Sequence, residues 1–239
     1  ELYLRRRPNT SNRKGNFDIF LTGIPANHQL LRMFKRHINV IQHPICPIFY
    51  WALRIVLGWS GICLRLPFYG DEFDEFDDVN PSLSFTEEEE KLGRELLSEM
   101  GIPAGAPFVC IFARDNEYLN QTHPDKNNPA VWEMHNHRNT DIDSLLKSAD
   151  YLADRGIYTV RMGQVVEKPL RTSNPKIIDY ATFHRTDFGD VYLVAKCSFF
   201  LGCTSGIITV AQIFNVPIAW TNLIPLWHLP LGNRDIFIP

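Results

Sequence analysis

The sequence lacks the features that mark several specialised classes of protein. Its 24 Lys and Arg residues against 27 Asp and Glu residues give a net charge of −3, so no nucleic acid is implied as a partner. Its length of 239 residues excludes a short disulfide-stapled peptide, and its five cysteines, which are odd in number and lie mostly in apolar runs such as FVCIFA, favour a reducing compartment. The opening residues, ELYLRRRPNT, show neither an initiator Met nor a signal pattern, so we expect a fragment of a longer protein without an export signal.

Core-forming material and an uneven distribution of charge are present instead. Apolar residues make up 45% of the 239 residues, which is enough for one large domain or two modest ones. Residues 1–36 carry a local net charge of +6, whereas residues 71–90 hold ten acids and no base. We therefore predict an N-terminal domain over residues 1–80 and a C-terminal domain over residues 86–239. An acidic loop inside a single domain is the alternative.

The longest apolar segment is PICPIFYWALRIVLGWSGICL, residues 44–64, which holds Arg54 as its one charge. Its length approaches the ~20 residues that span a bilayer. Two prolines, two glycines and the Arg are unfavourable in a lone spanning helix, so we predict a buried helix, with a segment at a membrane interface as the second possibility. The corresponding location is the cytoplasm, peripheral to an inner membrane.

Short β-branched and aromatic runs alternate with helical patterns after residue 105. This alternation predicts a parallel sheet flanked by helices. The predicted strands cover 107–113, 157–162, 176–181, 198–202 and 216–220, and the predicted helices lie near 141–155, 187–196 and 206–214. A weaker alternation places a strand at 17–23, a helix at 26–36 and a strand at 38–43. The predicted fold class is therefore α/β with two Rossmann-like lobes.

Ligands of such a sheet bind beyond the carboxyl ends of its strands. There, the turn GCTSG offers small residues whose amides can approach an anionic oxygen such as that of a phosphate: Gly202, Thr204, Ser205 and Gly206. A simple helix cap at Thr204 or Ser205 is the structural alternative.

A 26-residue loop, residues 114–139, follows the first strand of the C-terminal lobe and is longer than most loops without a function. Arg114 and Arg138 suit bidentate binding of phosphate or carboxylate. Asn139 or Thr140 is placed to cap the next helix. The His135-x-His137 pair is a weak metal motif, so we predict no metal site and prefer sugar or phosphate contacts or a general base.

Two further residues have structural and functional interpretations of equal standing. Arg161 lies inside a predicted strand, where it either forms an ion pair or faces a ligand. Asp187 begins a predicted helix, where it is either an N-cap or a ligand contact.

The segments GNFDIFLTGIPANHQLLRMFKR, IFARDNEYL, HNHRNTDIDS, DFGDVYLVAKCSFFLGCTSG and FNVPIAWTN together resemble a family of bacterial glycosyltransferases associated with surface-carbohydrate biosynthesis. The resemblance implies a GT-B-like fold with an incomplete N-terminal, acceptor-side lobe. It also implies metal-independent transfer from a nucleotide-sugar donor to a surface-polysaccharide or lipid-linked glycan acceptor, and peripheral membrane contact. No cofactor beyond the donor is expected.

The resemblance and the sequence pattern together give the candidate site. The catalytic candidates are Asp115, His135 and His137. The substrate-binding candidates are Arg114, Asn136, Arg138, Asn139, Gly163, Asp187, Gly202, Thr204, Ser205 and Gly206. A nucleotide-sugar epimerase or hydrolase, and a non-catalytic nucleotide-sugar-binding module, are the alternative functions.

Overall fold

The computed structural model describes residues 1–6, 18–57, 79–122, 136–223 and 232–237. Its N-terminal part contains α1 (Leu2–Arg6), β1 (Ile19–Thr22), α2 (His28–Lys35), β2 (Asn39–Gln42) and α3 (Cys46–Leu57). The strands β1 and β2 pair in parallel, with α2 as the crossover between them. The strand, helix and strand predicted for residues 17–43 are thus confirmed.

The C-terminal part begins with α5 (Glu87–Glu99), whose start is fixed by a capping box. The Thr86 side chain accepts from the Glu89 amide, and the Glu89 side chain accepts from the Thr86 amide. Four glutamates in the first turn add a favourable interaction with the helix dipole. The last four residues of the acidic stretch, Glu87 to Glu90, therefore form the first turn of this helix.

A six-stranded, fully parallel sheet forms the centre of the molecule, in the order β5-β4-β3-β6-β7-β8. Its strands are β3 (Phe108–Phe112), β4 (Tyr158–Arg161), β5 (Ile177–Ile178), β6 (Phe200–Gly202), β7 (Ile218–Trp220) and β8 (Ile236–Phe237). Helices flank it on both faces, so the predicted α/β class is confirmed.

The side chains of β3 alternate between the two faces of the sheet. Phe108 and Cys110 join the larger core cluster with α10 (Asp187–Lys196) and α11 (Ile208–Ile213). Val109 and Ile111 face the opposite cluster, which includes residues of η3 (Ile142–Leu145) and of the adjoining α8 (Leu146–Ala153). Successive side chains of β3 thus point to opposite faces of the sheet, and both faces are covered by helices, as in a three-layer α/β domain.

The chain reverses its direction across the sheet between β3 and β6. From β3 the chain proceeds to β4 and β5 on one side, and from β6 it proceeds to β7 and β8 on the other. The connections therefore diverge at β3 and β6, which makes the carboxyl ends of these two strands the topological switch point of the sheet. This switch point is the position at which open parallel sheets bind ligands.

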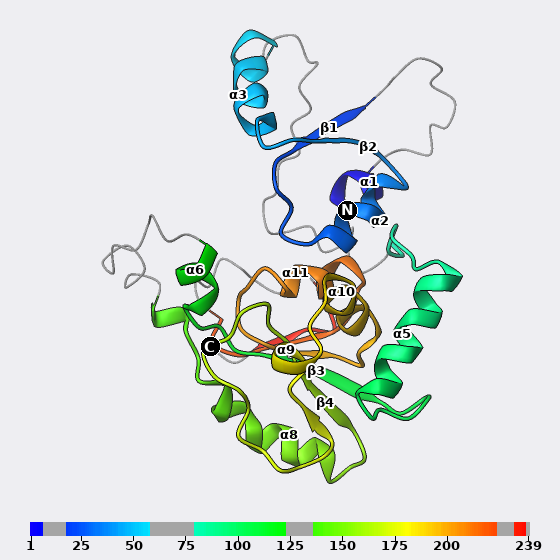
Figure 1. Ribbon diagram of the computed structural model, residues 1–239, viewed down its shortest axis with the longest axis vertical. Coiled ribbons are helices and arrows are strands. Elements are labelled where there is room, and N and C mark those ends of the chain that lie inside the picture. Colours follow the sequence, from blue (N-terminus) through cyan, green and yellow to red (C-terminus); the bar gives the residue numbers. More distant parts are fainter. Residues whose placement is uncertain (7–17, 58–78, 123–135, 224–231, 238–239) are drawn as a thin grey trace.

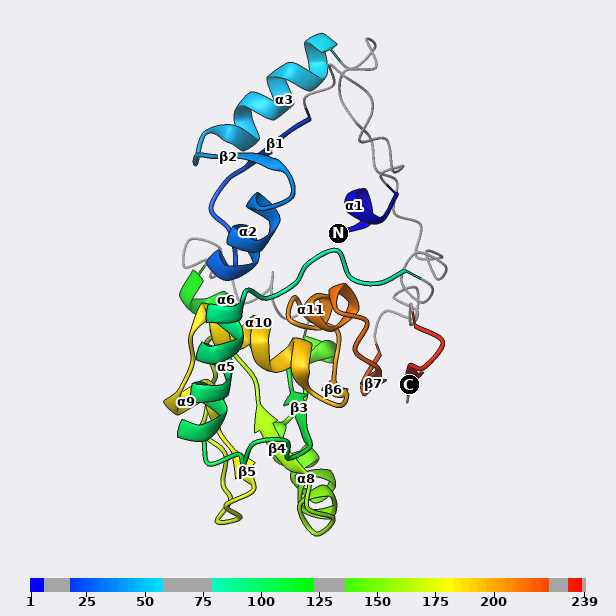
Figure 2. The same ribbon diagram turned by 90° about the vertical axis from the view of Figure 1, so that its right-hand side faces the viewer.

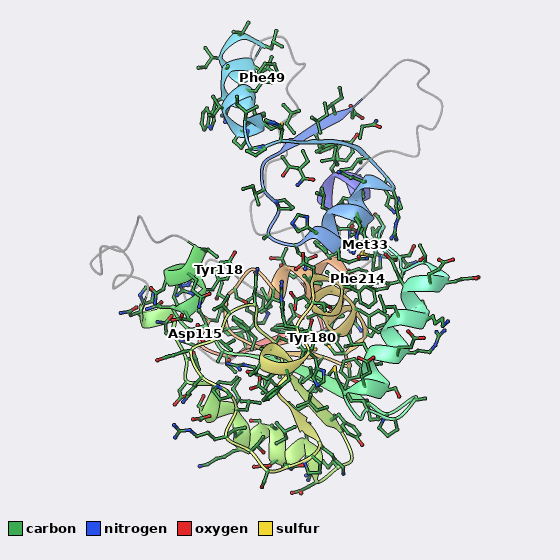
Figure 3. The ribbon with its side chains drawn as sticks, in the orientation of Figure 1. Met33, Phe49, Asp115, Tyr118, Tyr180 and Phe214 are labelled. Atoms are coloured by element: carbon green, nitrogen blue, oxygen red, sulfur yellow. The ribbon has the colours of Figure 1, made fainter. Side chains whose placement is uncertain are left out.

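The helix α2 joins the N-terminal part to the C-terminal sheet and lies beside α10 in both views (Figures 1 and 2). Met33 of α2 is fully buried in the larger core cluster. Figure 3 shows it close to Phe214, which ends α11 and packs against the same cluster. The division at residues 80–86 stays a prediction, because part of the N-terminal segment shares this core.

The helix α3 corrects the prediction of a buried helix at residues 44–64, as far as its described residues 46–57 reach. It lies at the far end of the molecule (Figures 1 and 2), and Ile48, Trp51 and Ile55 are exposed by 71%, 59% and 77%. The two-stranded sheet beneath it offers too little surface to cover a helix that is apolar on all sides. No described helix has the length and apolar character needed to cross a membrane.

Several short elements were not predicted from the sequence. They are α1, α6 (Glu117–Thr122), η2 (Asn136–Arg138), α9 (Tyr180–Phe183) and β8. The strand predicted at 176–181 contracts to the two residues of β5, because α9 begins directly after Asp179. Two capping predictions also change: Asp141 rather than Asn139 or Thr140 caps η3, and Thr186 rather than Asp187 caps α10.

Candidate functional site

The segment of residues 136–140 lies over the carboxyl ends of three neighbouring strands. The amide of Thr140 donates to the carbonyl of Arg114 after β3, over 2.9 Å. Arg138 Nη2 reaches the carbonyl of Thr204 after β6, over 3.4 Å. The side chain of Asn222, after β7, donates to Thr140 Oγ1 over 3.1 Å. The sequence prediction that these strand ends share one rim is thereby confirmed for β3, β6 and β7.

Two guanidinium groups converge at the switch point. Burial and then the nearby positive charge of Arg138 lower the pKa of Arg114, so the two arginines are close enough to repel each other. Arg114 Nη1 donates to Asn139 Oδ1 over 3.2 Å. No ion pair joins Arg138 to a described carboxylate. A bound anion between them would relieve this repulsion.

Three segments that meet at this rim carry buried polar atoms without a hydrogen-bond partner. Arg138 Nε, Ser205 Oγ and Thr221 Oγ1 are each buried and unpaired. Leaving such an atom unpaired costs about 1–3 kcal/mol, so a cluster of them is typical of a site that is completed by a ligand or water. Donors predominate here, because a guanidinium offers only N–H groups and a hydroxyl can donate.

The turn after β6 contacts both arginines through its Cys203 side chain and its Thr204 carbonyl. Cys203 Sγ accepts from the amide of Arg114 over 3.2 Å, and burial raises the pKa of this thiol. Thr204 is buried, whereas Gly206 is exposed and a Cβ added there would meet no atom within 4 Å. The helix α11 begins only at Ile208 and is six residues long, so its dipole is smaller than the predicted helix would have.

The catalytic candidates are held in different ways. Both carboxylate oxygens of Asp115 accept backbone amides, those of Glu117 over 3.0 Å and Glu167 over 3.1 Å. Asp115 thus ties the turn after β3 to the loop after β4, beside α6 (Figure 3). His137 is exposed in η2. His135 lies outside the described residues.

The remaining candidates divide between the rim and other parts of the molecule. Asn136 and Asn139 belong to the 136–140 segment, and Asn136 Oδ1 accepts from Asn116 Nδ2 over 2.7 Å. Gly163 is buried after β4, where an added Cβ would lie 2.5 Å from Val166. Asp187 instead binds α2, because its carboxylate accepts the amide of His28 over 2.9 Å.

The structural interpretation of Arg161 is confirmed. Its guanidinium pairs with Asp179 over 3.0 Å, and both side chains are buried. Asp179 also accepts from the Leu170 amide, so the pair anchors the loop between β4 and β5. Within the described parts of the chain, no three His, Cys, Asp or Glu side chains are grouped to hold a metal ion.

The candidate site predicted from the sequence includes neither Asn222 nor Thr140. Asn222 follows the fifth predicted strand, and an Asn after a strand is an ordinary turn residue. A stronger signal was its position directly after a strand next to β6, at the same edge as the GCTSG turn. That signal becomes informative only when the strand order is known.

Comparison with known proteins gives no family model that matches and no curated protein with significant similarity. Among solved structures, the chain resembles a glycosyl transferase family 9 protein from Veillonella parvula, with 17% identity and a TM-score of 0.45. The match covers 95% of this chain and 63% of that one, so this chain spans less than two thirds of its length. A second structure is KpsC, the β-Kdo 2,4 transferase of Thermosulfurimonas dismutans, with 11% identity, a TM-score of 0.31, and coverage of 90% and 84%. Likeness of this degree does not assign an activity.

Proposed function

We propose that this protein is a glycosyltransferase that moves a sugar from a nucleotide-sugar to a surface-polysaccharide or lipid-linked glycan acceptor. The observation that best supports a nucleotide-sugar site is the pair of arginines at the switch point. Arg114 and Arg138 lie at the switch point between β3 and β6, where Arg138 Nε and Ser205 Oγ are buried and have no hydrogen-bond partner. A diphosphate satisfies both the charge and the unpaired donors.

The same geometry suits the departure of a nucleoside diphosphate. Negative charge grows on the leaving phosphate as the glycosidic bond breaks, and fixed cations stabilise that charge more in the transition state than in the ground state. Arg114 and Arg138 are proposed in this role, with the backbone of the turn at residues 202–206. The acceptor hydroxyl loses its proton to a base as its oxygen bonds to the sugar.

His137 is the favoured base among the described residues. It is exposed on the same 136–140 segment as Arg138. Asp115 is the less favoured candidate because its two oxygens already accept amides, which suits a positioning role. His135 remains part of the proposal on its sequence position alone. We propose no bound metal and no further cofactor, so a chelator should leave turnover unchanged.

The first prediction concerns Arg138. Replacing Arg138 with Ala should weaken binding of a nucleoside diphosphate by about 1.5–3 kcal/mol, because a hydrogen bond to a charged group is lost. Isothermal titration calorimetry measures this. The matched control is Arg155→Ala. Arg155 lies between α8 and the start of β4, at the amino ends of the strands, and it stacks on Tyr151. Unchanged affinity in Arg138→Ala would remove that arginine from the site.

Activity assays separate transfer from its alternatives. A screen of nucleotide-sugars by thermal shift identifies the donor, because a ligand of the folded state raises the melting temperature. Full turnover of that donor without an acceptor would indicate an epimerase or hydrolase. Tight binding without turnover against a panel of glycan acceptors would indicate a non-catalytic binding module.

The second prediction concerns the acceptor side, for which we propose peripheral contact of α3 with a membrane. Exposed Ile48, Phe49 and Ile55 on this helix would bury apolar area in the headgroup region. The protein should co-sediment with vesicles of phosphatidylethanolamine and phosphatidylglycerol, and Ile48→Asp with Ile55→Asp should abolish this. The same two changes should not lower stability, because both positions are already exposed. Equal sedimentation of the variant would refute contact through α3.

A further inference from the structure

The segment of residues 136–140 carries Arg138, yet it contains a single short 3-10 helix and little internal support. Within it, the amide of Asn139 donates to the carbonyl of Asn136 over 2.9 Å. A second internal bond joins Asn139 Nδ2 to Asn136 Oδ1 over 3.4 Å. The other hydrogen bonds of the segment reach residues that follow β3, β6 and β7. The position of the Arg138 guanidinium therefore depends on these outward contacts.

One side of the segment is fixed to the end of β3. The amide of Thr140 and the side chain of Asn139 both bind Arg114, over 2.9 Å and 3.2 Å. These contacts hold the segment at one point only. A second attachment is needed to prevent rotation about the first.

Asn222 provides that second attachment at the end of β7. Its Nδ2 donates to Thr140 Oγ1 over 3.1 Å and to the carbonyl of His137 over 3.4 Å. These two acceptors lie on either side of Arg138 in the chain. In the sheet, β6 lies between β3 and β7. Arg138 contacts the carbonyl of Thr204, which follows the end of β6.

The backbone of Asn222 is also specialised for this role. Its φ is +49°, a left-handed conformation that Asn and Gly adopt more readily than other residues. Thr221 lies between the end of β7 and Asn222, and its amide donates to the carbonyl of Gly202 over 2.9 Å. The backbone from which the Asn222 side chain extends is therefore held in place by the hydrogen bond between Thr221 and β6.

We infer that Asn222 is a positioning residue of the anion site, which holds the 136–140 segment so that Arg138 faces the end of β6. This inference rests on the proposed function, because it assumes that an anion binds at Arg138. Asn222 does not itself touch the anion. Asn222 therefore affects anion affinity only by positioning Arg138, and it has no effect on affinity when the Arg138 guanidinium is absent.

The test measures binding of inorganic pyrophosphate to the full chain by calorimetry. Asn222→Gly keeps the left-handed backbone and removes the donor, and Thr140→Val removes the acceptor from the other side. Each should weaken binding about three- to tenfold, the equivalent of one ordinary hydrogen bond. The matched control is Asn215→Gly, since Asn215 also has a positive φ, of +52°, but bonds Arg5 and Val79 beyond the far end of α11.

A double-mutant cycle separates positioning from a general structural role. In the Arg138→Ala background, Asn222→Gly should cause no further loss of pyrophosphate affinity. An equal loss in both backgrounds, or wild-type affinity in Asn222→Gly, would overturn the inference while leaving the anion site intact. A wild-type protein that binds no pyrophosphate would refute the anion site and this inference together. Thr140→Val carries the test if Asn222→Gly does not fold, which the melting temperature reports.

Discussion

At the scale of single residues, the two glycines of the turn after β6 are constrained differently. Gly202 pairs with Phe112 of β3, and an added Cβ would lie 2.6 Å from the Phe112 carbonyl oxygen. A backbone oxygen in the middle of a sheet cannot move away cheaply. Gly206 is exposed, has no positive φ, and has open space where a Cβ would lie.

The third prediction contrasts these two glycines. Gly202→Ala should lower the free energy of unfolding by about 1–3 kcal/mol, as overpacking does, whereas Gly206→Ala should change it by less than about 0.5 kcal/mol. Urea denaturation measures both. Gly206→Ala should still weaken pyrophosphate binding if the turn at residues 202–206 contacts the anion. Equal stability of the two variants would show that β3 and β6 are not paired as described.

Single-residue chemistry could be predicted wherever it depends on strand ends. Arg114 and Thr204 were placed in the candidate site by the rule that the carboxyl ends of parallel strands share an edge, and Arg138 contacts Thr204 there. The role of Asp187 did not follow, because its partner His28 is distant in the sequence and lies on a separate helix. The two hydrogen bonds that Asp115 accepts could not be predicted either, since one of the donating amides belongs to a loop 52 residues away in the sequence.

At the scale of elements, the contact between α5 and α10 depends on a glycine. Gly93 is buried in α5, and a Cβ there would lie 2.0 to 2.3 Å from ring atoms of Tyr192 in α10. The ring is 3% exposed and is packed against Phe85 and Phe188. It has little room to move.

The fourth prediction is that Gly93→Ala destabilises the protein by about 1–3 kcal/mol through this overlap, even though Ala is favoured over Gly in a helix by about 1 kcal/mol. The exposed Ser98→Ala on the same helix is the control. In a Tyr192→Ala background, which is itself destabilised, Gly93→Ala should cost less than in the wild type, because the overlap is removed. Urea denaturation of the wild type, the two single variants and the double variant decides, and strictly additive effects would contradict a direct contact.

Elements with a clear period or cap could be predicted, and those set by their surroundings could not. The strand β3 was predicted at 107–113, and the capping box at Thr86, like the alternation in β3, depends on residues that are close together in the sequence. The two-residue β5 and the six-residue α11 are shorter than their apolar patterns indicate. The exposure of α3 was the clearest failure, because an apolar run reports a preference for burial and not the presence of a surface to bury against.

At the scale of the whole molecule, a charged network joins α2 to the C-terminal lobe. The side chain of Asn27 donates to the Asp187 carbonyl over 2.8 Å. The carboxylate of Asp187 and that of Asp190 both pair with Arg185, over 2.7 Å and 2.9 Å. Asp190 also accepts from the hydroxyl of buried Tyr180, over 3.1 Å. The attachment of α2 thus involves buried charge as well as the apolar contact of Met33.

The fifth prediction concerns the pH dependence of this network. Burial raises the pKa of Asp190 from 3.8 to about 6, although Arg185 opposes the rise. The folded state then binds this proton more tightly than the unfolded state does. The stabilising contribution is complete below about pH 4 and is lost as the pH rises to about 6, with an upper limit of about 3 kcal/mol for a difference of two pKa units.

Asp190→Asn isolates this effect, since an amide does not titrate. Between pH 4 and pH 6, the free energy of unfolding of the wild type should fall relative to that of the variant, and above pH 6.5 the difference should be constant. Urea denaturation at half-unit steps of pH measures it, with the exposed Asp154→Asn as the control. If the wild-type and Asp190→Asn curves run parallel from pH 4 to pH 7, Asp190 titrates as an ordinary carboxyl and the network does not bury its charge.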